Sequence, residues 1–443
     1  DIRNEISVVE QVPFNSTNKY MSTKASDGIL YVKGAPEVVS RLCGDDSYLE
    51  EVSKQQSRGR RAISFASGQD IEHLEYDGSV FIEDPIRPDV PAAIKKCYEA
   101  GVDVVMMTGD NIKTAAEIAR QAGFSRKLQG QPEKDVWAVE AKDFDKVAWG
   151  DPMCGYPNVI ARCKPEDKLN ILKKFKELGK GTATEHVCAM TGDGVNDSPS
   201  LNHADVGIAM GSGTSVAKEA SDIVLLDDAF PSIVTGIKWG RSLYKNIQSF
   251  LVFQLIINVA TCLVVVLSPI LGVDMPFTVT QMLWVNIVMD TLAALCLASE
   301  PADENVLTEK PRKQNAFILT KPMYKTIIGM GIFVFGVLSL IVHDIAQGSI
   351  KFGLDLTELF AIFMMINWWN LFNIRVFGKN RSIFYNLKGS SKFLLGSLVI
   401  FIGTILIVQF GGEIFNTRPL DFKEWCIIVA STSPIVIIRE IWH

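Results

Sequence analysis

Two polar segments place an aspartate beside a glycine directly after a short apolar run, a pattern suited to phosphate chemistry. Glycine allows a tight turn whose backbone N–H groups can face an anion. Carboxylates at such turns, here those of Asp193 and Asp197, can hold Mg²⁺ together with phosphate oxygens and water. The first segment, MMTGDN, contains Thr108, Gly109 and Asp110, and the second, MTGDGVNDSP, contains Asp193, Gly194, Asn196 and Asp197.

A lysine between these segments, Lys168 in CKPEDKLNIL, supplies a fixed positive charge for a phosphoryl group. A metal ion, a cationic side chain and oriented polar groups are the parts that phosphoryl transfer requires. A single TGD would be a weak signal, because Asp and Gly are common turn formers. The ten residues TGDGVNDSPS, downstream of a second TGD and a lysine, are a strong one.

Alternating strand and helix patterns surround these segments over residues 79–230. This alternation predicts an α/β domain with a parallel sheet flanked by helices. In such sheets chemistry sits at the carboxyl ends of the strands, where both segments fall. The expected strands are SVFIED, VDVVMMTGD, NVIAR, HVCAMTGDGVND and VGIAM, and the clearest helices are PAAIKKCYEAG and IKTAAEIARQAG.

The N-terminal residues predict a partial α+β domain. VVEQVPFNSTNKYMST and GILYVKGAP are expected to form antiparallel strands, with helices around 37–43 and 47–58. We therefore divide the chain into residues 1–75, the α/β domain at 76–232, and an all-α region at 233–443.

Six stretches of the all-α region are long and apolar enough to cross a bilayer, which needs roughly 20 residues. One such stretch could be a buried helix of a soluble protein, but six in a row predict a six-helix transmembrane bundle in a multi-pass integral membrane protein. Lys and Arg are most frequent in loops 299–323 and 375–392, so we expect these loops and the polar N-terminal part on the cytosolic side. The stretches are 247–271, 277–298, 324–343, 356–374, 393–411 and 424–441.

Polar side chains within these stretches mark candidate sites, because polar groups are costly in a bilayer. Asn286 and Asp290 are four residues apart and share one helix face. We favour a cation site there, and oxygen ligands suit a hard cation such as calcium. Asn367, Asn370 and Asn373 also share a face, for which a cation site and interhelical hydrogen bonding are both open.

Composition excludes other classes of function. The net charge of −6 gives no basic surface for nucleic acid, so no nucleic-acid partner is expected. The eight cysteines are scattered without paired spacing, which indicates reduced thiols.

The chain resembles the P-type ATPases, whose phosphorylation domain has a haloacid-dehalogenase-like fold. The resemblance is carried by KGAPE at 33–37, RRAISFA at 60–66, EDPIRPDV at 83–90, TGDN at 108–111 and TGDGVNDSP at 191–199. It implies that Thr108, Gly109 and Asp110 position the γ-phosphate of ATP, that Lys168 contacts the phosphoryl group, and that Asp193, Asn196 and Asp197 complete a Mg²⁺ site. It also implies that Lys33 lies near the adenine and Arg61 at an ATP phosphate, with Asp84 and Arg87 in a hinge.

Within that family, WVNIVMDTLAALCLASEP at 284–301 most resembles calcium pumps of the plasma-membrane type. The resemblance implies Asn258, Asn286 and Asp290 as calcium ligands. Thr261 and Met289 stand where pumps with two calcium sites have further ligands, so we expect one Ca²⁺ per ATP and a plasma-membrane location. Leu371 replaces a glutamate of the family pattern, which leaves a role for that position open.

No DKTGT, the family's phosphorylation motif, occurs in the sequence, and the chain opens on DIRNEISVVE. We therefore expect a fragment that lacks the phosphorylated aspartate and the first strand of its sheet, and that is inactive without the N-terminal half of the same pump. The resemblance also assigns part of the calcium site to that half. Two alternatives are another P-type pump, for Na⁺, K⁺ or H⁺, and a membrane-anchored phosphatase of the haloacid-dehalogenase type. A third is a regulatory subunit without catalysis.

Overall fold

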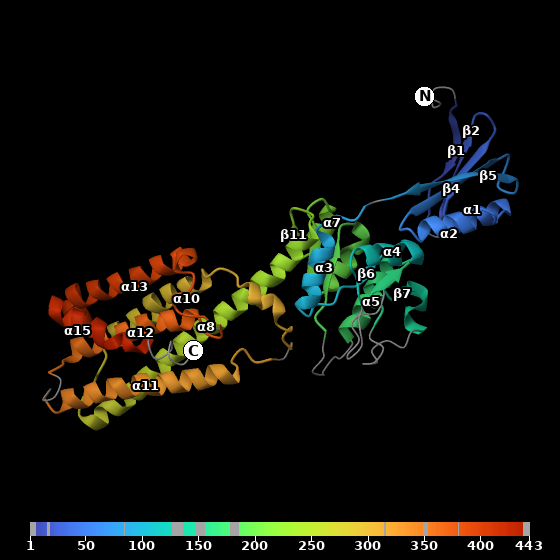
Figure 1. Ribbon diagram of the computed structural model, residues 1–443. Coiled ribbons are helices and arrows are strands. Elements are labelled where there is room, and N and C mark those ends of the chain that lie inside the picture. Colours follow the sequence, from blue (N-terminus) through green and yellow to red (C-terminus); the bar gives the residue numbers. More distant parts are fainter. Residues whose placement is uncertain are drawn as a thin grey trace. The chain divides into compact units, whose positions relative to one another are not determined.

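The computed structural model describes residues 6–15, 18–83, 85–125, 136–146, 156–177, 186–313, 316–348, 353–379 and 381–436. Contacts divide the chain into two compact units (Figure 1). The first comprises Asp1–Gly236 with Leu307–Gln314, and the second comprises Ile237–Val306 with Asn315–His443.

An antiparallel five-stranded sheet forms the beginning of the first unit, in the order β1-β2-β3-β4-β5. Helices α1 (Pro36–Cys43) and α2 (Leu49–Gln56) pack on it, and the core contains Val32, Val39 and Ala66. These elements confirm the strands and helices predicted for the N-terminal residues. The strands are β1 (Val8–Val12), β2 (Tyr20–Ala25), β3 (Leu30–Gly34), β4 (Arg61–Gly68) and β5 (Leu74–Ile82).

Strand β5 corrects one prediction. Its sequence SVFIED was assigned to the parallel sheet, but β5 pairs antiparallel with β4, with Ile63 opposite Val80. Only residues 69–73 separate the two strands. A parallel crossover needs a dozen or more residues, so this connection allows only a hairpin.

Two parallel three-stranded sheets follow, with orders β6-β8-β7 and β11-β10-β9. The predicted parallel architecture is thus confirmed, but as two sheets rather than one. The strands are β6 (Met106–Met107), β7 (Ala138–Glu140), β8 (Val159–Ala161), β9 (Ala189–Gly192), β10 (Val206–Met210) and β11 (Ile223–Leu225). The accompanying helices are α3 (Val90–Glu99), α4 (Ile112–Gln121), α5 (Pro165–Glu177), α6 (Ser198–His203) and α7 (Ser215–Glu219).

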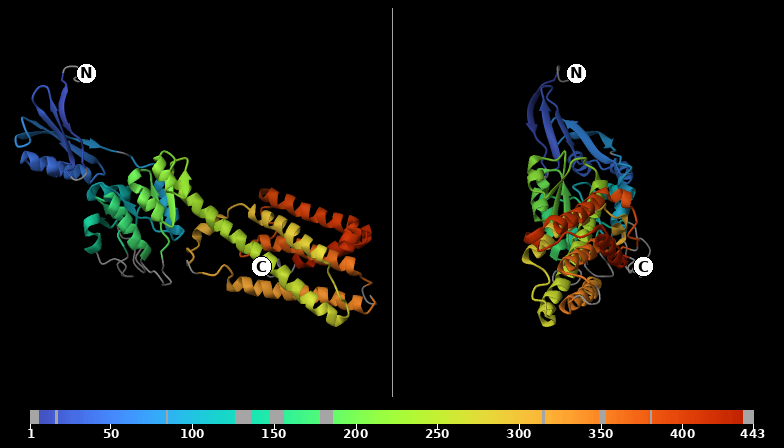
Figure 2. Two further views of the ribbon diagram at one scale, coloured as in Figure 1. Left: turned by 180° about the vertical axis from the view of Figure 1, so that it is seen from behind. Right: turned by 90° about the vertical axis from the view of Figure 1, so that its left-hand side faces the viewer.

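The second unit consists of helices around one apolar core (Figure 2). A π-helix at Trp284–Met289 joins two α-helical pieces, so one apolar stretch contains α9, the π segment and α10. The helices are α8 (Phe230–Leu271), α9 (Val279–Leu283), α10 (Asp290–Ala298), α11 (Lys321–Ala346), α12 (Leu356–Arg375), α13 (Ser391–Phe410), α14 (Gly412–Phe415) and α15 (Phe422–Thr432).

Four helical segments of the described residues are long and apolar enough to cross a membrane: Phe230–Leu271, Val279–Ala298, Lys321–Ala346 and Leu387–Phe410. The predicted count of six is not reached. The stretch 356–374 forms α12, whose asparagines reduce its apolar character. The stretch 424–441 is represented by α15, which has 11 residues, and the last part of that stretch lies outside the described residues.

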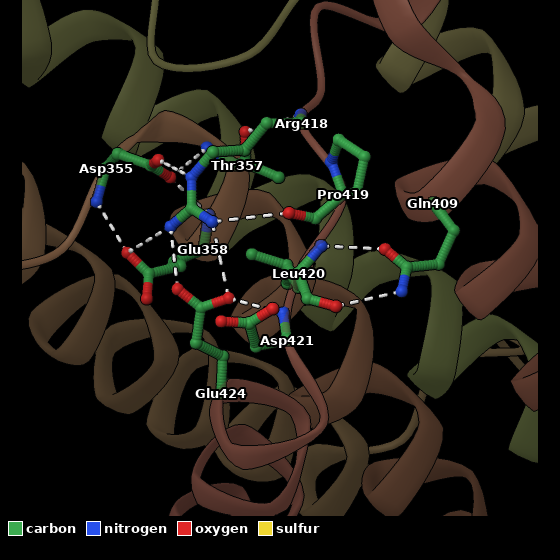
Figure 3. Close-up of polar contacts among 9 residues, drawn as sticks. All are labelled: Asp355, Thr357, Glu358, Gln409, Arg418, Pro419, Leu420, Asp421 and Glu424. Atoms are coloured by element: carbon green, nitrogen blue, oxygen red, sulfur yellow. Dashed lines mark hydrogen bonds and ion pairs between the residues drawn. The ribbon is translucent and has the colours of Figure 1, made fainter.

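Arg418 joins the N-terminal ends of α12 and α15 (Figure 3). Asp355 caps α12 by accepting from the backbone N–H groups of Thr357 and Glu358, and Glu424 accepts from the backbone N–H of Asp421 in front of α15. The Arg418 guanidinium lies 2.5 Å from the Asp355 carboxylate and 2.9 Å from that of Glu424. The single guanidinium of Arg418 therefore binds the capping carboxylates of both helices. The dipole of each helix also stabilises the negative charge of its carboxylate at that N-terminal end.

Candidate functional sites

The TGD segment forms a tight turn after β6. The Thr108 hydroxyl donates to Asp110 Oδ2 at 3.2 Å and accepts from the Asp110 backbone N–H at 3.1 Å. The Thr108 N–H donates to the Ile160 carbonyl, and the Cys163 N–H donates to the Thr108 carbonyl, both at 2.9 Å. The neighbouring strand end therefore fixes the position of Thr108 and Asp110. A methyl group at Gly109 would find its nearest neighbour, the Cys163 carbonyl oxygen, at 3.7 Å, so packing alone does not require glycine there.

Arg162, which sequence analysis missed, lies at the end of β8 beside this turn. Its backbone has a φ of 54°, which costs free energy in a residue other than glycine. Its N–H donates to the Asp110 carbonyl at 3.0 Å, and its guanidinium lies 2.5 Å from Glu37 Oε1. The sequence did offer one signal for Arg162, which directly follows the apolar run NVIA. Parallel sheets bind their ligands at the carboxyl ends of such strands.

Lys168 and Asp197 connect the carboxyl ends of the two parallel sheets. Lys168 is on α5, which follows β8, and Asp197 follows β9. The lysine Nζ lies 2.7 Å from Asp197 Oδ1, and Asp197 is 6% exposed. A Cβ at Gly192 would lie 2.5 Å from the Cβ of Asp197. Only glycine at this position therefore leaves room for the Asp197 side chain. The structure thus brings together two predicted residues that are far apart in sequence.

Asp193 and Asn196 stand at the surface of the same turn, and both are exposed. The Thr214 N–H donates to the Asp193 carbonyl at 2.8 Å, which ties this turn to the one following β10. Gly213 packs against it so closely that a Cβ would lie 3.0 Å from that carbonyl oxygen. The backbone of Asp193 is therefore fixed while its carboxylate faces outward.

The donors here fit Mg²⁺, which prefers a few carboxylates with phosphate oxygens and water. The Asp193 carboxylate is exposed and suits this role. Oδ1 of Asp197 is bound by Lys168, and its Oδ2 is 3.4 Å from the Gly194 N–H. In the described parts of the chain, no three His, Cys, Asp or Glu side chains gather as a self-sufficient metal site.

The two predicted ATP residues lie on one face of the antiparallel sheet. Lys33 on β3 is opposite Phe65 on β4, and Arg61 is four residues before Phe65 on the same strand. Because side chains alternate along strands, Arg61, Phe65 and Lys33 point to the same side. Val32 and Ala66 point to the other side, into the core below α1.

Arg61 also contacts the TGD turn. Its guanidinium lies 3.0 Å from Asp110 Oδ2, so the predicted phosphate ligand is paired with a residue of the signature turn. Of the predicted hinge residues, Arg87 donates to the Asp228 carbonyl at 2.7 Å, while Asp84 lies outside the described residues.

The cation candidates lie in the second unit, around an irregular helix. Asn286 is inside the π segment and Asp290 begins the regular helix α10. The Asp290 N–H donates to the Val285 carbonyl, five residues back, as in a π-helix. Such segments are frequent at functional sites. Nothing in the sequence pattern had indicated this irregularity.

Asp290 is 2% exposed, and neither of its carboxylate oxygens has a hydrogen-bond partner among the described residues. Buried polar groups in native proteins are nearly always paired, so an unpaired buried carboxylate is unusual. Asn286 is exposed on the unit and Asn258 on α8 is half-buried. Asn370 on α12 is 1% exposed and its amide is also unpaired within the described chain.

Comparisons with known proteins fit both units. Residues 5–205 match the family model of haloacid dehalogenase-like hydrolases, and residues 274–443 match that of the C-terminus of cation transporting ATPases. The chain belongs to the P-type ATPase family.

Within this family, the chain is similar to plasma membrane calcium-transporting ATPases. It is 35% identical to plasma membrane calcium-transporting ATPase 1 of Mus musculus over 96% of the chain, and equally to that of Homo sapiens. It is 34% identical to plasma membrane calcium-transporting ATPase 2 of Oreochromis mossambicus, also over 96% of the chain. The chain spans 39% of the length of the first two relatives and 43% of the third.

Proposed function

We propose that this chain is part of an ATP-driven pump that exports Ca²⁺ across the plasma membrane through an aspartyl-phosphate intermediate. The observation that carries the proposal is Asp290, a buried carboxylate without a partner in an apolar helix. An ionised carboxylate at membrane depth requires a cation, and oxygen ligands from Asp290 and the amides of Asn286 and Asn258 suit Ca²⁺. One carboxylate with two amides supports a single ion per ATP.

The strand ends of the first unit would bind and orient the nucleotide. Lys168 supplies a positive charge beside the reacting phosphoryl group, and Thr108 and Asp110 present a fixed turn to the γ-phosphate. Gly109 leaves room for a phosphate to approach, since nothing packs against it more closely than 3.7 Å. Lys33 and Arg61 would hold the adenine and a phosphate of ATP. Mg²⁺ held by Asp193, with Asp197 as the second predicted ligand, would neutralise phosphate charge.

A further parallel strand would lie between β6 and β9 and carry the phosphorylated aspartate. Both are edge strands of their three-stranded sheets. Met107 of β6 packs against the apolar clusters of both sheets, and the Lys168–Asp197 pair connects their carboxyl ends. This strand would come from the N-terminal half of the pump, which is the expected partner of this chain.

The predicted organisation belongs to the same proposal. Residues 1–75 would complete a nucleotide-binding domain and residues 76–232 the phosphorylation domain, both cytosolic. Residues 233–443 would span the membrane six times, with α12 and the stretch beginning at α15 as the fourth and sixth spans. Helix α12 is buried along most of its length, so surrounding helices would shield its asparagines from lipid.

The decisive experiment measures ATP-driven calcium uptake into inside-out membrane vesicles containing the full-length protein. We expect uptake that requires ATP and stops in Asp290→Asn. Asp344→Asn is the matched control, because Asp344 is another buried aspartate of an apolar helix and should leave uptake intact. Equal ATP hydrolysis with Na⁺ or K⁺ alone would favour another cation pump. Hydrolysis of small phosphate esters without any ion dependence would favour the phosphatase.

A further inference from the structure

A single arginine at the end of α12 joins the ends of three helices in the second unit. Arg375 is 4% exposed, and its Nε donates to Glu300 Oε1 at 2.9 Å. Its other nitrogens donate to the carbonyls of Ile383 and Tyr385 and, at 2.7 Å, to the Ser390 hydroxyl. The fixed fork of the guanidinium allows all these bonds at once.

The two side-chain partners of Arg375, Glu300 and Ser390, mark helix ends. Glu300 lies two residues after the last residue of α10, is 6% exposed, and also accepts from the Ser390 hydroxyl at 3.2 Å. Ser390 immediately precedes α13, and the ring of Phe393 in its first turn lies 5.2 Å from the guanidinium carbon. Arg375 itself is the last residue of α12. The ends of α10, α12 and α13 are therefore held by one buried charge network.

A second arginine reinforces the same junction. Arg381 donates to Asp303 Oδ1 at 3.1 Å, and its guanidinium carbon lies 4.5 Å from the ring centroid of Tyr385. The segment after α10 is thus bound at Glu300 and again at Asp303 to the loop between α12 and α13. Two separate attachments resist rotation of that segment better than one.

Asp290 lies on the part of the helix that this junction holds. From Asp290 to Ala298 the chain is regular α-helix without glycine or proline, so it moves as a rigid piece. The irregular π segment lies entirely on the other side of Asp290. Side-chain packing continues the attachment along α13, because Gly396 faces Cys296 so closely that a Cβ would lie 2.2 Å from its sulfur.

We propose that Arg375 is a positioning residue for the cation site: by binding Glu300 and Ser390 it fixes the polar end of α10 and hence the depth and rotation of Asp290. This inference rests on the proposed function and adds to it a residue that touches no ion. Fixed in this way, Asp290 does not have to be reoriented when a cation arrives, which raises affinity. Movement at the site is then confined to the π segment that contains Asn286.

The test uses the full-length protein and compares Arg375→Gln with a matched control, Arg418→Gln. Arg418 also binds two carboxylates at the ends of helices, on the same α12, but its partners are at the opposite end and none belongs to α10 (Figure 3). Two quantities are measured: the maleimide reactivity of Cys296, which is 2% exposed, by peptide mass spectrometry, and the calcium concentration for half-maximal phosphorylation by ATP. The first quantity reports on α10 without any need for activity.

In Arg375→Gln we expect Cys296 to react about tenfold faster and half-maximal phosphorylation to need about tenfold more calcium. In Arg418→Gln both values should stay within about twofold of the parent. A double variant, Glu300→Gln with Arg375→Gln, removes both buried charges and should regain thermal stability while keeping both defects.

Equal reactivity of Cys296 in the two single variants would overturn the inference. So would a double variant that regains calcium affinity, because Arg375 would then only balance the charge of Glu300. A parent protein without calcium-dependent phosphorylation would refute the proposed function instead, and the reactivity of Cys296 would still decide whether Arg375 holds α10.

Discussion

The ammonium of Lys168 lies 2.7 Å from the carboxylate of Asp197, so a lysine that follows one parallel sheet is paired with an aspartate that follows the other. Lys168 is 20% exposed and Asp197 is 9% exposed at the side chain, which leaves little water to replace a lost partner. Removing one member of such a pair leaves a buried charge uncompensated.

Lys168→Gln should therefore lower the free energy of unfolding of the first unit by about 3 kcal/mol and abolish phosphorylation by ATP. Thermal unfolding of the full-length protein and radiolabelled phosphoenzyme measure the two effects. Lys168→Arg keeps the charge and should recover most of the stability. Unchanged stability in Lys168→Gln would show that water already solvates Asp197.

Replacement by alanine should affect the stability of the protein differently at Gly192, in the TGDGVND segment, and at Gly109, in the first TGD segment. Gly192→Ala forces a methyl group to 2.5 Å from the Cβ of Asp197 and should cost about 1 to 3 kcal/mol of stability. Gly109→Ala meets nothing closer than 3.7 Å and should leave the unfolding midpoint unchanged. If Gly109→Ala nevertheless loses phosphorylation, the added methyl group obstructs the phosphate rather than the fold. Comparable stability losses in both variants would contradict this assignment.

Contact between α10 and α13 depends on a glycine. A Cβ at Gly396 would lie 2.2 Å from the Cys296 sulfur, so Gly396→Ala should lower the melting temperature of the detergent-solubilised protein. Adding Cys296→Ala removes the clashing sulfur and should restore most of the loss. Gly336→Ala on α11 is the control, because nothing lies within 4 Å of a Cβ there. A melting temperature that does not respond to Cys296→Ala would place the clash elsewhere.

Alkaline pH should destabilise the first unit through a half-buried thiol. Burial, assisted by the charge of Asp167, raises the pKa of Cys163 from 9.0 to about 11. Between these values the unfolded chain loses the thiol proton while the folded chain keeps it, so stability falls as pH rises from about 9 to 11. The loss should reach about 2 kcal/mol and should be absent in Cys163→Ser, as followed by chemical denaturation. A loss of the same size in that variant would assign the effect to other groups.

Local sequence patterns predicted the strand ends and their turns, because apolar runs followed by TGD and TGDGVND specify both the buried strand and the break. They failed where long-range geometry decides. β5 carries the same apolar signature as a parallel strand, and only its short connection to β4 makes it antiparallel. Arg162 owes its position beside Asp110 to a strand pairing that no local motif encodes.

The membrane helices show the same division. Long apolar runs located the helices, but asparagine-rich α12 is buried by its neighbours rather than by its own hydropathy. Arg375 binds Glu300, 75 positions away, and Arg418 binds Asp355, 63 positions away. The periodicity of apolar residues within one helix cannot predict contacts between residues so far apart in the sequence. The π segment follows from how the helix accommodates its surroundings, and its six residues WVNIVM look helical by any local measure.

That segment holds one more residue in its turn than an ordinary helix would. Suppose that the backbone hydrogen bonds of the π segment changed from five-residue to the usual four-residue spacing. The part of the helix before the segment would then rotate about the helix axis, relative to the part after it, by about 100°, the angle between successive residues of an α-helix. Asn286, which is exposed in the present helix, would then share one face with the buried Asp290, while the helix axis stayed where it was. The two oxygen donors could thus be brought together to hold an ion, and parted again to release it, by a local rewinding with no tilting of whole helices.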